Sequence, residues 1–357
     1  MPRVDVSLDL PLLVRLLQDP RRLRDLSPQQ WRSAIDAAEH TRVLGWLIDQ
    51  ADVHHACPVA PDWLADRVLV SRALVSEYER SLRWEIDRLT RAFQGRGFGW
   101  VLLKGAAYVA ARLPSGRGRR VADVDVLVPH EHLAAAEAAL REHGWHFAEL
   151  DAYDTRFYRE WMHELPPMIH GDRGSVVDLH HSILPQTSRL HPPTVRLFER
   201  ARAVDERIRV LSPAHMVLHA AAHLFHDGEI AGSIRDIVDL DTLFRCFDRE
   251  PGFWDDFVAE ARALELSRPA YYAVRYARRL LDTPVPADVV TAVTAAEPAV
   301  PVRTLMDALV GRTLAGQTGR SSSLAALALY VRSHWLRMPP LLLARHLLRK
   351  SMRRESI

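Results

Sequence analysis

Three aspartates and one lysine are the residues of this chain whose types and spacing could support catalysis. Asp123 and Asp125 are separated by one apolar residue within the apolar run 121–128. Because side chains alternate along a strand, both carboxylates point to the same face. Two like charges side by side need a nearby cation to stay ionised. Oxygen ligands favour a hard divalent ion, so the pair predicts a site for Mg²⁺, with Mn²⁺ as the alternative.

A lysine-glycine turn precedes this pair. Lys104 and Gly105 follow a short apolar run at 98–103 and precede a helical pattern at 106–113. Backbone N–H groups at such a turn suit phosphate, as does the N-terminus of the following helix. The chain has only one other lysine, Lys350, and otherwise uses arginine. Lysine supplies a compact point charge that arginine does not, which favours a specific role for Lys104. A metal site beside a phosphate turn indicates nucleotide chemistry.

A third carboxylate is available in the alternating segment 175–184. The alternation puts Asp178 and His180 on one face and His181 on the other. If this strand neighbours the strand at 121–128, three carboxylates meet, which is the arrangement that two-metal nucleotidyl transfer requires. Asp178 would then ligate a metal ion or take the proton of the attacking group. The alternative is that the aspartates are strand-end residues that face solvent.

Composition describes a globular protein with enough chain for two or three domains. The 357 residues are 48% hydrophobic and 26% charged, and the formal net charge is +2. Long nucleic acid is therefore a weaker candidate partner than a small molecule or a peptide. Cys57 and Cys246 are far apart, which predicts neither a disulfide framework nor a thiolate zinc site. We find no signal peptide, and the apolar run at 324–331 is too short to span a bilayer, so the expected location is the cytoplasm.

The periodicity of apolar residues divides the chain into three regions. Residues 1–93 show helical spacing, residues 94–185 alternate short strand and helix patterns, and residues 186–357 are helical again. We therefore expect an α+β protein with a small sheet core between two helical regions. Within the core, strands are expected at 98–103, 121–128, 145–150 and 175–184, helices at 106–113 and 130–143, and a flexible basic loop at 114–120.

Taken together, these motifs resemble the nucleotidyltransferase superfamily of DNA polymerase β. More closely, the chain is similar to a branch of uncharacterised nucleotidyltransferases, the NTP_transf_5 type, and the helical segments 211–215 and 235–239 share its character. The motifs that carry the resemblance are Leu102-Leu103-Lys104-Gly105, Arg120, Asp123-Val124-Asp125-Val126-Leu127-Val128 and Val177-Asp178-Leu179-His180.

The resemblance implies a mixed-sheet nucleotidyltransferase core at 94–185 and Mg²⁺-dependent transfer of a nucleoside monophosphate from an NTP. Asp123 and Asp125 would ligate the metal, and Asp178 would complete the triad. The branch is associated with bacterial peptide and natural-product gene sets, which suggests natural-product tailoring. The acceptor could be a small molecule, a peptide or a protein, and the sequence does not indicate a choice among ATP, GTP, CTP and UTP.

The phosphate turn departs from the superfamily. Most members have Gly-Gly or Gly-Ser where this chain has Lys104-Gly105-Ala106. Lys104 could replace the missing hydroxyl as a charge-assisted donor to the triphosphate. Arg119 and Arg120, just before the metal pair, could do the same, or they could lie in a solvated loop.

Histidines provide auxiliary candidates. A histidine-containing stretch commonly lies between the two acidic strands in this branch, so His163 and Glu164 are candidates for acceptor binding or base catalysis. An ordinary loop or core histidine is the alternative. His180 is the stronger candidate, because it shares a face with Asp178 and could orient the carboxylate, contact phosphate or ligate metal.

A rival interpretation comes from a helical stripe of histidines: His215, His219, His223 and His226. His226 and Asp227 are similar to the paired ligands of HD phosphohydrolases, which would make the protein a metal-dependent phosphohydrolase. We expect instead that the stripe is packed and lines the cleft facing the core. A third possibility is a non-catalytic nucleotide-binding protein.

Two further features have mainly structural interpretations. We expect Arg235 to form an ion pair with Asp236 or Asp239 on the next helix. The basic segment 332–354 could form an amphipathic helix that contacts anionic lipid, nucleic acid or a partner protein. We favour a packed helix with a solvated basic face.

Overall fold

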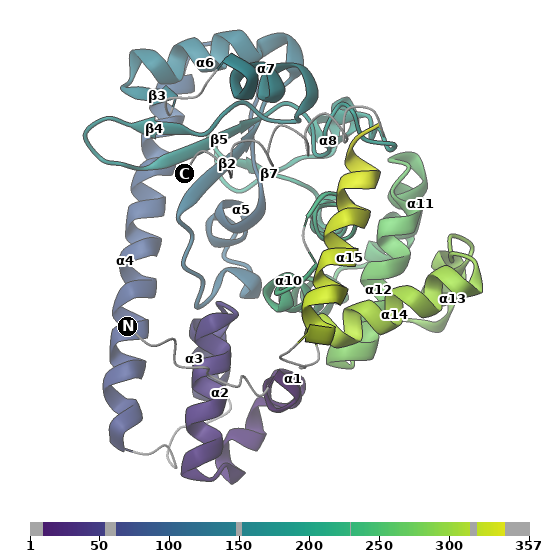
Figure 1. Cartoon of the computed structure of the whole chain (residues 1–357). Coiled ribbons are helices and arrows are strands. Elements are labelled where there is room, and N and C mark those ends of the chain that lie inside the picture. Colours follow the sequence, from purple (N-terminus) through teal and green to yellow (C-terminus); the bar gives the residue numbers. More distant parts are fainter. Residues whose placement is uncertain (1–9, 54–61, 148–151, 229, 315–319, 340–357) are drawn as a thin grey trace.

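The structure is a computed structural model in which helices surround one mixed sheet (Figure 1). It describes residues 10–53, 62–147, 152–228, 230–314 and 320–339. The seven strands lie in the order β3-β4-β5-β2-β1-β7-β6. Their bounds are β1 Val101–Leu102, β2 Asp123–Leu127, β3 Trp145–Phe147, β4 Met168–His170, β5 Val176–His180, β6 Arg202–Ala203 and β7 Arg209–Val210. The expected α+β class with a mixed sheet is confirmed.

The helices form groups before, within and after the sheet. Before it are α1 Leu10–Gln18, α2 Pro28–His40, α3 Leu44–Val53 and α4 Asp62–Phe93. Within it are α5 Lys104–Ala110, α6 Leu133–Glu142 and α7 Ala152–Trp161. Helix α8 Thr194–Glu199 lies between β5 and β6, and after the last strand come α9 Pro213–Ala222, α10 Ile234–Phe247, α11 Phe253–Ala263, α12 Ser267–Leu281, α13 Ala287–Thr294, α14 Val300–Leu314 and α15 Arg320–Arg337. Short 3₁₀ turns cover Pro20–Asp25, Pro114–Gly116 and His130–His132, and a π-helical turn covers His223–Asp227.

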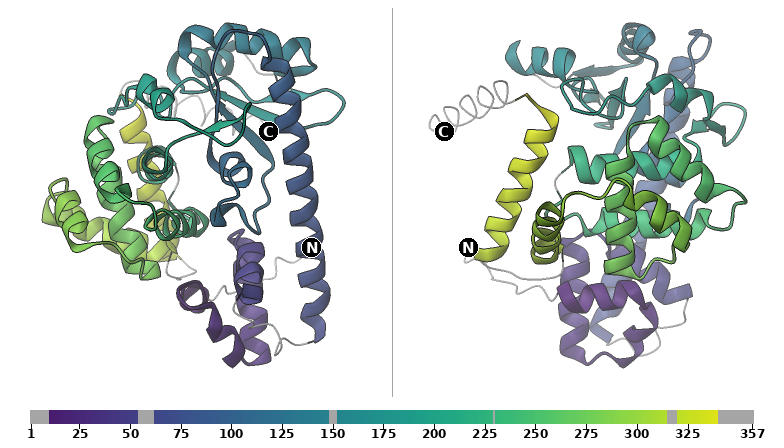
Figure 2. Two further views of the ribbon diagram at one scale, coloured as in Figure 1. Left: turned by 180° about the vertical axis from the view of Figure 1, so that it is seen from behind. Right: turned by 90° about the vertical axis from the view of Figure 1, so that its right-hand side faces the viewer.

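The N-terminal helices follow the sequence pattern closely. Ser27 accepts a hydrogen bond from the backbone of Gln30, and the Gln30 side chain accepts one from Ser27, which is a complete capping box. Helix α4 is long enough to pack against α3 at one end and against α6 near the sheet. Figures 1 and 2 show α4 running between these two parts of the molecule.

Strand β2 lies at the centre of the sheet. It is parallel to β5 on one side and antiparallel to β1 on the other. Val124, Val126 and Leu179 are almost completely buried and supply the apolar face of these strands. Because side chains alternate, Asp123 and Asp125 lie on the opposite face. The hydrophobic pattern thus fixes which way the carboxylates point.

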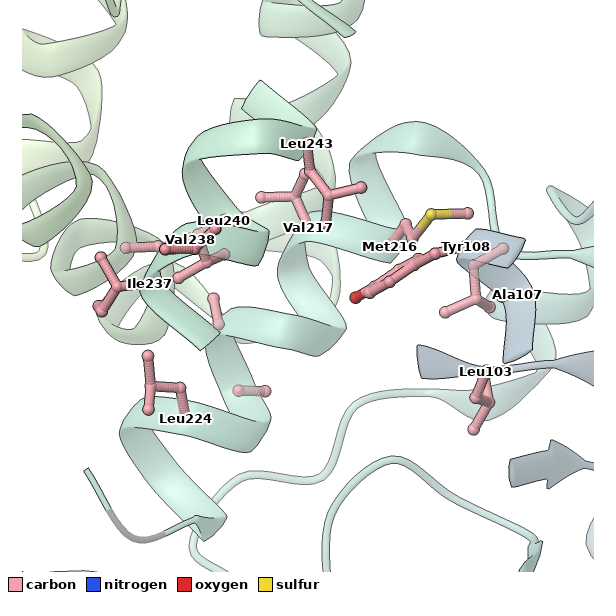
Figure 3. Packing of buried hydrophobic residues seen from close by; sticks show 14 of the residues in the cluster. Leu103, Ala107, Tyr108, Met216, Val217, Leu224, Ile237, Val238, Leu240 and Leu243 are labelled. Carbon is pink, nitrogen blue, oxygen red and sulfur yellow. The ribbon is translucent and has the colours of Figure 1, made fainter. Parts of the chain in front are cut away.

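Apolar packing joins the sheet to the C-terminal helices. Leu103, Ala107 and Tyr108 at α5 belong to the same buried cluster as Met216 and Val217 of α9 (Figure 3). The described residues therefore share one continuous core. The division at 1–93, 94–185 and 186–357 stays a prediction, and β6 and β7 extend the sheet past residue 185.

Several expectations about local structure were incomplete. The four predicted strands exist but are shorter, and the last residues of the strand expected at 145–150 lie outside the described part. The helix expected at 106–113 begins already at Lys104. Strands β4, β6 and β7 and helix α7 were not predicted. The strands contain only two or three residues each, too few to show a period of two.

The prediction of a flexible loop at 114–120 was wrong. Gly118 has φ +62°, and a Cβ built there would lie only 2.2 Å from backbone atoms of Gly45. A Cβ on Gly116 would likewise come within 2.9 Å of the Tyr108 backbone. The glycines allow close backbone contact with α3 and α5, so they pack the loop instead of loosening it.

The basic C-terminal segment lies largely beyond residue 339, outside the described residues. Within the described part, Arg332 donates a hydrogen bond to the carbonyl of Phe225 at 2.8 Å. Thr187 donates one to the carbonyl of Arg337, also at 2.8 Å. The described end of α15 is therefore packed, while the favoured packed helix with a solvated basic face over 332–354 stays a prediction. Among the helices that the structure describes, none combines the length and hydropathy needed to cross a membrane.

Candidate active site

The sheet brings the three predicted aspartates together. In the parallel pairing of β2 and β5, Asp125 lies opposite Asp178 and Asp123 lies opposite Val176. This confirms the prediction that the two acidic strands are neighbours. Asp123 is exposed, Asp178 is partly buried and Asp125 is only 4% exposed. The carboxylates therefore extend from solvent into the protein along one face of the sheet.

Asp125 is held by two donors that reach the same oxygen. Lys104 Nζ donates to Asp125 Oδ1 at 2.7 Å, and His180 Nε2 lies 2.9 Å from it. Burial alone would raise the pKa of Asp125, but Lys104 and His180 outweigh it and hold that pKa far below its usual value. Burial would lower the pKa of Lys104, but Asp125 outweighs it and raises that pKa. Asp125 is therefore a fixed anion.

The backbone at Lys104 is strained. Its φ of +44° falls in the left-handed region, which costs a residue with a side chain about 1–2 kcal/mol. A glycine would adopt this conformation without strain. Strain of this kind is frequent at functional sites, which favours a specific role for the ammonium group.

Too little positive charge surrounds Asp178 and Asp123 to balance their carboxylates. Asp178 Oδ1 is buried and has no hydrogen-bond partner among the described residues. Burial, followed by the charges of Asp125 and Glu164, raises the pKa of Asp178 to about 7. Burial and Asp125 also raise the pKa of Asp123. One ammonium group cannot balance this cluster, so the donor set fits a divalent cation.

His163 and Glu164 belong to the same site. Glu164 forms a β-bridge with His180, and Leu165 N donates to Leu179 O at 2.9 Å. Glu164 Oε2 lies 3.4 Å from His180 Nε2. The sequence did not predict this extended segment, because Pro166 and Pro167 interrupt the strand pattern.

The histidine stripe divides into two pairs. The outer pair is engaged elsewhere: His215 Nε2 lies 2.7 Å from Glu260 Oε2, and His226 Nε2 lies 2.7 Å from Ser188 Oγ. The inner pair, His219 and His223, is close enough to Lys104 and Asp125 to be influenced by their charges, and the expectation that the stripe lines a cleft stays a prediction. Burial and then the Lys104 ammonium lower the pKa of both imidazoles.

A π-helical turn carries the end of this stripe. It begins at His223, where the regular α9 ends, and it also contains His226 and Asp227. Such turns are frequent at functional sites because they shift side chains off the α-helical stripe. The spacing of the histidines does not reveal the turn, so the sequence could not separate the inner pair from the outer pair.

The two arginines before β2 have different surroundings. Arg119 donates a hydrogen bond to Asp239 and stacks over Tyr108, so its charge is already paired inside the protein. Arg235 Nε donates to the same aspartate at 3.1 Å, which confirms the expected ion pair on α10. Arg120 is exposed, and no ion pair is described for it. Of the two, Arg120 therefore has the more available guanidinium.

Gly105 is required by packing. A Cβ there would lie 2.8 Å from Arg119 Nε and 3.0 Å from a methyl group of Val121. The glycine lets the start of α5 approach the segment that leads into β2. It therefore helps to hold Lys104 next to Asp125.

A well-formed pocket among the described residues lies away from the carboxylates. It has a volume of about 520 Å³ and is lined by residues between Tyr271 and Glu297, on α12, α13 and the segments that follow them. None of its residues belongs to the carboxylate site. The converging carboxylates, and not cavity size, therefore identify the candidate active site.

Comparison with known proteins agrees with this geometry. The family model described as uncharacterised nucleotidyltransferase matches residues 27–282, a span that includes every candidate residue named above. No curated protein and no solved structure matches the chain. Enzymes of this kind transfer a nucleoside monophosphate from an NTP, generally with a divalent metal. On the extent of this match, the chain belongs to the uncharacterised nucleotidyltransferase family.

Proposed function

We propose that the protein transfers a nucleoside monophosphate from an NTP to a small-molecule, peptide or protein acceptor, with Mg²⁺ as the divalent cation. The observation that carries the proposal is the β2–β5 register, which sets Asp125 opposite Asp178 with Asp123 on the same face. The family match supports nucleotidyl transfer in general.

The donor set supports the choice of metal. Asp123, Asp125 and Asp178 would hold Mg²⁺, because they offer carboxylate oxygens only, including a buried Asp178 Oδ1 without a hydrogen bond. Bound Mg²⁺ would supply charge neutralisation for the triphosphate and for the developing negative charge. Mn²⁺ has the same ligand preferences and is the expected substitute.

Asp178 is the proposed proton acceptor. In the metal-free protein burial and neighbouring carboxylates raise its pKa to about 7; a bound cation would lower that pKa, so that the carboxylate is ionised and able to take a proton. In the proposed reaction an acceptor oxygen or nitrogen attacks the α-phosphorus and transfers its proton to Asp178. The bond from the α-phosphorus to the bridging oxygen breaks, and pyrophosphate leaves with the electron pair.

The donor triphosphate has basic candidates at two places. Lys104 and Gly105 start α5 beside Asp125, and Arg120 is exposed just before β2. Lys104 is the best placed, because its ammonium group is already within 2.7 Å of a metal-binding carboxylate. Arg119 is a weaker candidate, because it would have to leave Asp239.

The acceptor is proposed only as a class. A net charge of +2 gives no general attraction for long nucleic acid, which favours a small molecule, a peptide or a protein. His163 Nε2 lies 3.9 Å from Glu164 Oε2, the charges of Lys104 and Asp125 influence His219 and His223, and the three imidazoles would offer hydrogen bonds to such an acceptor. Tailoring of a natural product is one setting that fits these properties.

Label transfer tests the reaction. The purified protein is incubated with each NTP carrying ³²P at the α- or the γ-position, with Mg²⁺ and pools of small molecules, peptides or proteins. We expect α-label, and not γ-label, to enter an acceptor, and we expect Asp123→Asn and Asp178→Asn to abolish the transfer. Transfer of γ-label, release of phosphate alone, or an unaffected Asp123→Asn variant would contradict the proposal. Binding without any transfer would favour the non-catalytic alternative.

A further inference from the structure

A second group of potential ligands adjoins the aspartates. His163, Glu164 and His180 each offer one ligand atom, and the three atoms lie within 4.8 Å of one another. Glu164 Oε2 is 3.4 Å from His180 Nε2 and 3.9 Å from His163 Nε2. Ligand atoms around a tetrahedral zinc ion, at metal distances of about 2.0–2.2 Å, lie roughly 3.3–3.6 Å apart. Only a small contraction would be needed to bind such an ion.

The backbone fixes this group in place. Glu164 is bridged to His180, and the amides of His181 and Leu165 donate to the carbonyls of His163 and Leu179, both at 2.9 Å. The three ligands thus lie on two paired extended segments instead of a free loop. A site built on paired segments is already organised for a ligand.

The imidazoles have unused hydrogen-bonding capacity. His163 is 5% exposed and His180 is fully buried, and Nδ1 of each ring has no partner among the described residues. Asp227 Oδ2 lies 3.9 Å from His163 Nε2, and Asp227 Oδ1 is also without a hydrogen bond. Both Nδ1 atoms are therefore unsatisfied on the side of the ring away from the site, and Asp227 Oδ1 has only the Arg337 guanidinium nearby, at 3.7 Å.

The donor types separate this group from the aspartates. Two imidazole nitrogens with one carboxylate form the ligand set of zinc and related transition metals, whereas Mg²⁺ prefers oxygen donors. Three protein ligands also leave a coordination position open. The Lys104 ammonium opposes a cation here, and Arg337 lies 3.7 Å from Asp227, but the carboxylates of Asp125, Glu164, Asp178 and Asp227 outnumber these two cations.

We infer that His163, Glu164 and His180 form a second metal site, next to the aspartate triad, for a borderline transition-metal ion such as Zn²⁺. Asp227 supplies a further oxygen donor close to His163. This site goes beyond the proposed nucleotidyl transfer and does not depend on it. The occupant would replace the proton on His180 Nε2, which now faces Asp125 Oδ1 at 2.9 Å, so the ion would lie beside that carboxylate.

Titration with Co²⁺ alone tests the inference, because Co²⁺ replaces zinc and its visible absorption reports histidine ligation. Metal-free full-length protein is titrated together with four variants. We expect one equivalent of Co²⁺ to bind to the wild type, competed by Zn²⁺ and not by Mg²⁺. Glu164→Gln and His163→Ala should weaken binding more than about tenfold. Asp123→Asn, in the triad, should weaken it less than Glu164→Gln does, and His130→Ala, an exposed histidine, should leave it unchanged.

Three results would overturn the inference. These are no stoichiometric Co²⁺ absorption in the wild type, full affinity in Glu164→Gln, or equal loss in Asp123→Asn, which would put the ion in the triad. Glu164→Gln keeps the size of the side chain, so it decides the test if His163→Ala does not fold. Because no nucleotide is present, failure here would leave the proposed function intact.

Discussion

At the scale of single residues, Asp178 should make the stability of the metal-free protein depend on pH. Its pKa is about 7 in the folded protein and about 4 in an unfolded chain. A raised carboxyl pKa stabilises the fold at low pH, and this contribution is lost as pH rises from about 4 to 7. The free energy of unfolding of the wild type should therefore fall by about 2 kcal/mol relative to Asp178→Asn between pH 5 and 7.

Urea denaturation of both proteins in the presence of a chelator measures this difference. Parallel pH profiles for the wild type and Asp178→Asn would show that the carboxyl group is not perturbed. If Mg²⁺ added at pH 8 removes the difference in the free energy of unfolding between the two proteins, this would indicate that the same carboxylate binds the ion.

Lys104 combines an ion pair with a strained backbone, and two substitutions separate these effects. Lys104→Met and Lys104→Gly both leave the buried Asp125 without its main partner, which should lower the free energy of unfolding by about 2–4 kcal/mol. Lys104→Gly also relieves the positive φ, so it should be about 1 kcal/mol more stable than Lys104→Met. Equal stability of the two variants in denaturant melts would argue against strain, and wild-type stability of Lys104→Met would argue against the ion pair.

At the scale of elements, the packed segment 114–120 gives the clearest test. Gly118→Ala adds a Cβ about 2 Å from the Gly45 backbone and also strains a residue at φ +62°. Gly95→Ala introduces the same kind of strain at φ +73° but meets no atom within 4 Å. We expect about 1 kcal/mol of destabilisation for Gly95→Ala and at least about 3 kcal/mol for Gly118→Ala. Similar melting temperatures for the two variants would mean that segment 114–120 is flexible, as its composition suggested.

The elements also show what sequence patterns can and cannot predict. The strands that carry Asp123, Asp125 and Asp178 were predictable because aspartates interrupt a regular apolar alternation. That β2 and β5 are neighbours could only be assumed, because the sequence between them does not determine strand order. The segment 114–120 was misjudged, because glycine allows close packing as well as flexibility, and composition does not distinguish the two.

The site shows the same limit. His180 was identified because it shares the strand period with Asp178, and the register confirms that both lie on the face of Asp125. The positions of His219 and His223 relative to the site depend on a π-helical turn and on the packing of α9 near α5. The spacing of the histidines in the sequence shows neither feature. Arg119 was taken as a phosphate candidate because its partner, Asp239, is distant in the sequence.

At the scale of the whole molecule, Asp239 connects the sheet core to the C-terminal helices. It is 3% exposed and accepts hydrogen bonds from Arg119, before β2, and from Arg235 on α10. Asp239→Asn removes the carboxylate that accepts hydrogen bonds from both guanidinium groups and should cost about 3–5 kcal/mol. Glu79→Gln, which breaks an exposed pair with Arg83, should cost less than about 1 kcal/mol. Comparable losses in urea melts would contradict a central role for Asp239.

The central claim is that the three aspartates form a metal-dependent nucleotide site, and ligand-induced stabilisation tests it most directly. The melting temperature is measured with each NTP, with and without Mg²⁺, for the wild type, Asp123→Asn and the exposed control Asp288→Asn. An NTP at about 100 times its Kd should raise the melting temperature by about 3–4 °C. We predict such a rise for at least one NTP, only with Mg²⁺, in the wild type and Asp288→Asn but not in Asp123→Asn. An equal rise in Asp123→Asn, or no rise with any NTP, would contradict the claim.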